Sequence, residues 1–326
     1  MDTKNIAFPE TLQEAIAYFS DPDRAFNYAV MLRWPDGKVM CPRCDSDRHS
    51  FVKTRRLWYC NPCKKQFTLK VGTIFEDSPL GMDKWMAAVW MLVGCKNGIS
   101  SYELHRALGV TQKSAWFMLH RIRKALQSGS FLKLMGEVEV DETFIGGKAR
   151  FMHVRKRAER IHGTGGKDKV AVLGFLQRGG EVRTTIVETR RKAMLQSEVR
   201  KNVSAGAALY SDALASYEGL NGEFFHQVVD HAVEYVRGNV HTNGLENFSS
   251  LVKRGLKGTY VSVEPFHLFR YLDEQAFRFN YRRGMKDVDR FKLAMSKVAG
   301  RRLTYAQLTG KEDGQLHQQS PEAGQA

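Results

Sequence analysis

The pattern of hydrophobic and polar positions changes several times along the chain and separates it into segments. Residues 1–38 show short helical patterns, and residues 39–72 hold most of the cysteines. Residues 78–130 place apolar side chains at helical spacing, whereas residues 135–285 alternate between strand and helix patterns. Residues 286–326 begin as a basic segment and end in a tail with almost no apolar residues, which we expect to be disordered.

The alternating segment begins with a strand whose two faces differ in chemistry. Residues 136–143 predict this strand, with Val138 and Val140 on one face and acidic residues, including Asp141, on the other. Further strands are predicted at residues 169–176, 181–187, 207–212 and 224–229, with helices at residues 193–203 and from about Thr242. Three antiparallel strands, a helix, a strand, and a later strand and helix are the order of a ribonuclease-H-like domain. We therefore expect an α/β fold whose mixed sheet is flanked by helices.

Two helices with clear capping signals are predicted within residues 78–130. Ser100 and Glu103 form a capping box, Gly109 ends the first helix, and Thr111 caps a second helix that extends to about Leu126. This arrangement predicts a helix-turn-helix DNA-binding domain, although a helical hairpin in a bundle has the same pattern. The basic residues of the second helix are expected to contact DNA: Lys113, Arg121, Arg123 and Lys124.

Four cysteines occur as two Cys-x-x-Cys pairs, Cys41 with Cys44 and Cys60 with Cys63. A two-residue gap lets both thiolates of one turn face the same ion, and two such turns complete a tetrahedron. We expect a structural Zn²⁺ site in a zinc ribbon, with short strands between and after the pairs. The alternative is a pair of redox-active dithiols or free thiols.

The charge balance favours a polyanionic partner. The chain has 50 Lys and Arg against 35 Asp and Glu, a formal charge of +15. DNA fits this charge, although ribosomal contacts or an anionic membrane would attract it too. The longest apolar run, residues 85–95, is too short to cross a bilayer, and no secretory signal is evident. We expect a bacterial cytoplasmic, nucleoid-associated protein without membrane contact.

Three carboxylates occupy the positions that a ribonuclease-H-like domain uses for metal-dependent chemistry. They are Asp141 on the first strand, Asp212 at the end of the fourth, and Glu246 on the late helix. Two Mg²⁺ or Mn²⁺ ions need hard oxygen ligands of this kind. Lys253 follows Glu246 by seven residues, close to two helical turns, and is expected to lie on the same face and hold a DNA phosphate.

Several motifs resemble bacterial insertion-sequence transposases of the DDE type, in the ISXO-like group. Residues 138–148 (VEVDETFIGGK) resemble the first-aspartate motif of that group. Residues 241–248 (HTNGLENF) through 253–260 (KRGLKGTY) resemble the third-carboxylate motif, and residues 271–280 (YLDEQAFRFN) are similar to the closing signature. Because the group also begins with a zinc ribbon and a helix-turn-helix, the resemblance covers nearly the whole chain before the tail.

The resemblance implies that Asp141, Asp212 and Glu246 bind the catalytic metal ions, with Lys253 assisting. Some members of the group replace the third acid with asparagine, so Asn243 is an alternative to Glu246. Asp230 is the corresponding alternative to Asp212. Polar and basic residues of the third motif are expected to contact DNA: His241, Asn243, Arg254 and Lys257.

The resulting hypothesis is a transposase that binds the ends of its own element, cleaves them and joins the freed 3′-hydroxyl to target DNA. Pairing two ends requires at least a dimer on DNA. One alternative is a DNA-binding regulator derived from a transposase, which would bind without cleaving. Another is a structure-selective nuclease, which would cleave without joining.

Overall fold

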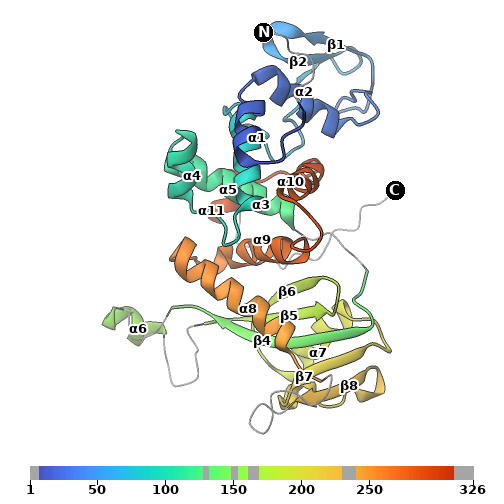
Figure 1. The fold of residues 1–326 in the computed structure, drawn as a ribbon, viewed down its shortest axis with the longest axis vertical. Coiled ribbons are helices and arrows are strands. Elements are labelled where there is room, and N and C mark those ends of the chain that lie inside the picture. The colour runs from blue at the N-terminus through green and yellow to red at the C-terminus, as the bar shows by residue number, and fades with distance from the viewer. Residues whose placement is uncertain (1–6, 128–131, 148–152, 161–168, 230–239, 312–326) are drawn as a thin grey trace.

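The computed structural model describes residues 7–127, 132–147, 153–160, 169–229 and 240–311. Figure 1 shows an elongated molecule with a small sheet near the N-terminus, helices in the middle and a larger sheet at the opposite end. Within these ranges, no helix is both long and apolar enough to cross a membrane.

The N-terminal part consists of two helices and a small antiparallel sheet. Its elements are α1 (Leu12–Phe19), α2 (Pro22–Arg33), β1 (His49–Val52), the 3-10 turn η1 (Lys53–Arg55), β2 (Leu57–Cys60) and β3 (Gln66–Phe67). The strand order β1-β2-β3 confirms the three strands predicted around the cysteine pairs. Trp58 of β2 stacks on Phe26 of α2 and on Phe67 of β3, so aromatic packing joins the ribbon to the helices.

Three helices follow: α3 (Met82–Gly94), α4 (Ser101–Leu108) and α5 (Gln112–Leu126). Ser100 and Glu103 cap each other's backbone N–H groups at the start of α4. Gly109 ends α4 in the left-handed conformation at φ 60°, and the Thr111 hydroxyl accepts from the Ser114 N–H at the start of α5. The two predicted helices and the turn between them are therefore confirmed.

The second half of α5 is buried, which contradicts the expectation that Arg121 and Arg123 contact DNA. Arg121 is 4% exposed and donates to the carbonyls of Ile74 and Leu303, at 3.0 and 3.2 Å. Arg123 is 1% exposed. An amphipathic pattern cannot distinguish a guanidinium that faces water from one that satisfies carbonyls inside the protein. Of the four predicted DNA contacts on α5, Lys113 is exposed and Lys124 is half-buried.

The larger sheet has five strands in the order β6-β5-β4-β7-β8. The strands are β4 (Glu137–Ile145), β5 (Val170–Gln177), β6 (Val182–Val187), β7 (Ala208–Asp212) and β8 (Phe225–Val229). The first three pair antiparallel, whereas β7 runs parallel to both β4 and β8. The sheet is therefore mixed, with strands and helices in the predicted order.

Helices cover both faces of this sheet (Figure 1). One face packs on α7 (Lys192–Asn202) and the 3-10 turns η3 (Ala215–Tyr217) and η4 (Leu220–Gly222). The other packs on α8 (Asn243–Gly255) and α9 (Leu268–Asn280), which are separated by the π-helical turn η5 (Leu256–Tyr260) and the 3-10 turn η6 (Pro265–His267). A short helix, α6 (Val154–Arg160), lies between β4 and β5 in the sequence.

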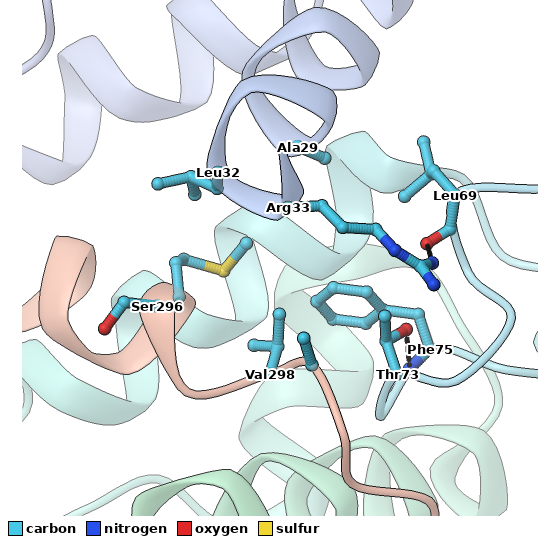
Figure 2. A pocket seen from close by; sticks show the side chains of 10 residues that line it. Ala29, Leu32, Arg33, Leu69, Thr73, Phe75, Ser296 and Val298 are labelled. Atoms are coloured by element: carbon cyan, nitrogen blue, oxygen red, sulfur yellow. Dashed lines mark hydrogen bonds between the residues drawn. The ribbon is translucent and has the colours of Figure 1, made fainter. Parts of the chain in front are cut away.

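The described part of the basic C-terminal segment returns to the N-terminal core. It contains α10 (Asp287–Ser296) and α11 (Tyr305–Thr309). Phe291 is fully buried, its ring 4.8 Å from that of Trp90, and the Ile74 N–H donates to the Val298 carbonyl. Figure 2 shows the small pocket at this junction, where Arg33 reaches the Leu69 carbonyl. Residues 312–326, where we expect a disordered tail, lie outside the described residues.

A buried charge cluster connects α5 to α9. Glu274 of α9 is 0% exposed and accepts from Arg123 Nε of α5 at 2.6 Å, from Arg278 and from the Tyr260 hydroxyl. The Arg123 guanidinium also lies 3.9 Å from the centre of the Tyr271 ring. Burial disfavours the charged form of Glu274, but Arg278 and Arg123 outweigh it and lower the pKa of this carboxyl below its ordinary value.

Removing the Glu274 carboxylate should strongly destabilise the fold. Glu274→Ala leaves two buried guanidinium groups without their anion, so the free energy of unfolding should fall by about 3–5 kcal/mol. Chemical denaturation followed by circular dichroism would measure this. Glu223→Ala is the control, because its ion pair with Arg200 is about half exposed and should matter little. Equal losses in the two variants would contradict this interpretation.

Candidate active site and zinc site

The four paired cysteines converge on one point. Their sulfur atoms all lie within 4.8 Å of one another, with Cys41 and Cys63 Sγ atoms 3.8 Å apart and Cys44 and Cys60 Sγ atoms 3.5 Å apart. Zn–S bonds of about 2.3 Å in a tetrahedron place sulfurs roughly 3.8 Å apart. All four are free thiols, so the geometry fits a closed, structural Zn²⁺ site.

Both cysteine pairs use the same backbone turn. The Asp45 N–H donates to the Cys41 carbonyl at 2.9 Å, and the Lys64 N–H donates to the Cys60 carbonyl at 3.0 Å. Asp45 and Lys64, each directly after the second cysteine of its pair, have positive φ angles of 51° and 58°. Two equivalent turns therefore present their thiols to a common centre, as the spacing predicts.

Asp141 lies on β4, the central strand of the larger sheet, and Asp212 lies on the adjacent strand β7. The last backbone pair between the parallel strands β4 and β7 joins Glu139 to Tyr210. Two residues further along each strand are Asp141 and Asp212, both half-buried. Each aspartate therefore lies two residues beyond the last backbone pair between these neighbouring strands, just past the point where their pairing ends. Asp230, the alternative to Asp212, lies outside the described residues.

The first turn of α8 lies over the strand pair that carries Asp141. Asp141 pairs with Gly174 of β5, and a Cβ on that glycine would lie 2.8 Å from Leu245 of α8. Glycine therefore allows the helix to approach the sheet closely at this point. Glu246, the next residue, is exposed in the first turn of α8, and Asn243 is exposed at its first position.

Across the part of the chain that the structure describes, the four cysteines are the one group of three or more His, Cys, Asp or Glu residues placed closely enough to hold a metal ion. The structure does not bring Asp141, Asp212 and Glu246 together into such a group.

Glu139 fixes the start of α8, a role that the sequence pattern did not reveal. Its carboxylate is 1% exposed and accepts from the Leu245 N–H at 2.9 Å and from Arg178 Nε at 3.0 Å. A carboxylate at a helix N-terminus is favoured by the helix dipole. His241 joins the network, with Nδ1 3.0 Å from Arg178 Nη2. The strand that carries Asp141 thus also positions the helix that carries Glu246.

Glu142 faces the opposite side of the sheet and was also missed. It accepts a hydrogen bond from the hydroxyl of buried Tyr217. Burial raises the pKa of Glu142 to about 7, against the opposing hydrogen bond from Tyr217, and the charges of Asp212 and Asp141 contribute to the rise. Its environment is therefore coupled to both aspartates of the candidate site.

Basic residues lie further along α8. Lys253 and Arg254 are exposed in its last turn, and the helix is unbroken from Glu246 to Lys253, so their two-turn spacing holds. Lys257 is exposed but lies in the π-helical turn η5, where the α-helical repeat changes. Its position relative to Glu246 is therefore not set by α-helical spacing.

Comparisons with known proteins agree with this organisation. Residues 20–66 match the transposase zinc-ribbon domain, and residues 133–280 match the ISXO2-like transposase domain. The chain is 29% identical over 258 residues to an uncharacterized protein in transposable element ISH50 of Halobacterium salinarum, covering 74% of this chain and 85% of the relative. It is 30% identical over 101 residues to an uncharacterized transposase-like protein of Haemophilus influenzae, covering 31% and 81%. No solved structure matches.

The zinc ribbon and the matched domain define the class as a zinc-ribbon transposase. The chain belongs to the IS1595 family of transposases, whose zinc-ribbon and transposase domains it carries in that order. This confirms the resemblance seen in the sequence.

Loss of one zinc ligand should release the ion and weaken the N-terminal core. Cys60→Ser should lower the zinc content from about one ion per chain to near zero, because a closed tetrahedral site needs all four thiolates. Elemental analysis and thermal unfolding would measure both effects. Cys95→Ser is the control, since Cys95 lies outside the cluster. Full zinc retention in Cys60→Ser would contradict the assignment.

A methyl group at Gly244 should displace the start of α8. A Cβ there would lie 2.5 Å from Leu176 Cδ2 and 2.9 Å from Glu139 Oε2. Gly244→Ala should therefore lower the free energy of unfolding by about 1–3 kcal/mol, measured by urea denaturation. Gly222→Ala is the matched control, because nothing lies within 4 Å of its added Cβ. A neutral Gly244→Ala would show that α8 does not pack closely on Glu139.

Proposed function

We propose that the protein is a DNA transposase that cleaves the ends of its element and joins them to target DNA by Mg²⁺-dependent phosphoryl transfer. The observation that supports this proposal is that Asp141 and Asp212 each lie two residues beyond the last backbone pair of two adjacent parallel strands, β4 and β7. The sheet order, with three antiparallel strands followed by two parallel ones, supports a ribonuclease-H-like domain. Membership of a transposase family supports DNA as the substrate.

Asp141, Asp212 and Glu246 would hold the metal ions. All three offer carboxylate oxygens, the ligands that Mg²⁺ prefers, and each is at least partly exposed to incoming DNA. When bound, the ions would supply Lewis-acid stabilisation at the scissile phosphate. Lys253, exposed two turns along α8, would hold a neighbouring phosphate as a point charge.

DNA would contact the exposed parts of the ribbon, the N-terminal helices and α8. The net charge of +15 supports this, because each cation that meets a phosphate releases a condensed counterion. On the helices, Lys113 and the half-buried Lys124 remain candidates. Around α8, the candidates are His241, Asn243, Arg254 and Lys257. Because two element ends must be paired, the active form would contain at least two copies of the chain.

A strand-transfer assay tests the proposal. Purified protein, labelled element ends and a target plasmid should give joined product that requires Mg²⁺. Asp141→Asn should lower its rate on the order of 10³-fold or more, as expected for a group that acts directly in catalysis. Glu137→Gln is the control, because Glu137 lies on the same strand and instead pairs with Tyr210.

Three outcomes would contradict the proposal in different ways. Specific DNA binding without cleavage would favour a regulator, and cleavage without joining would favour a nuclease. Joined product that survives Asp141→Asn would exclude the assigned site.

A further inference from the structure

The two strands that carry the aspartates separate at the candidate site. Backbone pairing between β4 and β7 ends at Glu139 and Tyr210. Beyond this point, β4 remains paired with β5 as far as Ile145, and β7 remains paired with β8 as far as Asp212. Asp141 and Asp212 therefore flank an interval in which the backbone pairing of β4 with β7 has ended, while each strand stays paired with its outer neighbour.

A side-chain hydrogen bond spans this interval on the α7 side of the sheet. Glu142 follows Asp141 directly and accepts from the Tyr217 hydroxyl. Tyr217 lies in η3, five residues after Asp212, and is 0% exposed within the same core as Val140. The contact joins the residue next to one aspartate to the turn that follows the other.

The turn that presents this tyrosine is held firmly in place. Gln196 of α7 donates to the carbonyls on either side of the tyrosine, those of Ser216 at 3.2 Å and Glu218 at 2.9 Å. At the other end of the turn, the Leu214 N–H donates to Asp212 Oδ1 at 3.2 Å. The position of the tyrosine hydroxyl is thus fixed relative to both α7 and Asp212.

We propose that Glu142 and Tyr217 are positioning residues whose hydrogen bond sets the separation of Asp141 and Asp212. Two carboxylates on neighbouring strands repel each other, and a hydrogen bond that acts as a tie across the interval beyond the last β4–β7 pair opposes this repulsion. The tie keeps both aspartates close enough to share divalent cations. This inference rests on the proposed function, which assigns metal binding to the two aspartates.

The same sheet contains a matched control. The Tyr210 hydroxyl donates to Glu137 Oε1 at 2.7 Å, so a second tyrosine–glutamate bond joins the same two strands. There, however, backbone hydrogen bonds already hold the strands together, since Glu137 pairs with Ala208. Losing that hydroxyl should leave the aspartates in place.

The test measures Mn²⁺ binding to the full-length protein by electron paramagnetic resonance, in the absence of DNA and of turnover. Tyr217→Phe should weaken Mn²⁺ binding by about 10-fold or more, the usual effect of losing a group that orients metal ligands. Tyr210→Phe should bind as the wild type does. Glu142→Ala should resemble Tyr217→Phe, and Glu142→Gln, which keeps an acceptor for the hydroxyl, should recover most of the loss. Unchanged Mn²⁺ affinity in Tyr217→Phe would overturn the inference.

Hydrogen exchange separates this inference from the proposed function. Without the tie, the amides of residues 211–217 should exchange faster in metal-free Tyr217→Phe than in Tyr210→Phe. If the wild type shows no Asp141-dependent Mn²⁺ binding, the metal assignment fails, and exchange alone then decides whether the tie exists. Equal exchange in the two variants would overturn it.

Discussion

The buried carboxylate of Glu274 is the constraint on which the arrangement of the two halves depends. It neutralises Arg123 from α5 and Arg278 from its own helix in an interior where neither cation could remain unpaired. The α3–α4 loop approaches it so closely that a Cβ on Gly98 would lie 2.6 Å from Glu274 Oε1. Gly98 also has φ of +81°, so glycine is needed there both for space and for backbone conformation.

This cluster holds α9 in a position from which it contributes side chains to two hydrophobic cores, that of the N-terminal part and that of the larger sheet. Phe277 packs into the N-terminal core, whereas Leu272 and Phe279 pack on the larger sheet. The same cluster anchors the end of the segment that begins with α8, because the Tyr260 hydroxyl donates to Glu274. With Glu139 holding its other end, the helix that carries Glu246 and Lys253 is fixed at both ends.

Successive side chains of strand β4 point to opposite faces of the sheet, so its acidic residues make different contacts on the two faces. Glu139 points towards α8 and caps it, whereas Glu142 points towards α7 and meets Tyr217. Asp141 lies between Glu139 and Glu142 in the sequence, beyond the last backbone pair of β4 with β7. A single strand therefore relates the candidate metal ligands to the helical layers on both faces of the sheet.

The sequence by itself determined the local features: the cysteine turns, the capped helices α4 and α5, the order of the strands, and the strands on which Asp141 and Asp212 lie. Each is encoded by spacing or capping between nearby residues, which acts before any long-range contact forms. Only the tertiary structure decided that Arg123 is buried beside Glu274, 151 residues away in sequence, and that α10 belongs to the N-terminal core. A charged side chain has the same pattern in sequence whether its partner is water or a distant carboxylate, so its burial is set by long-range packing.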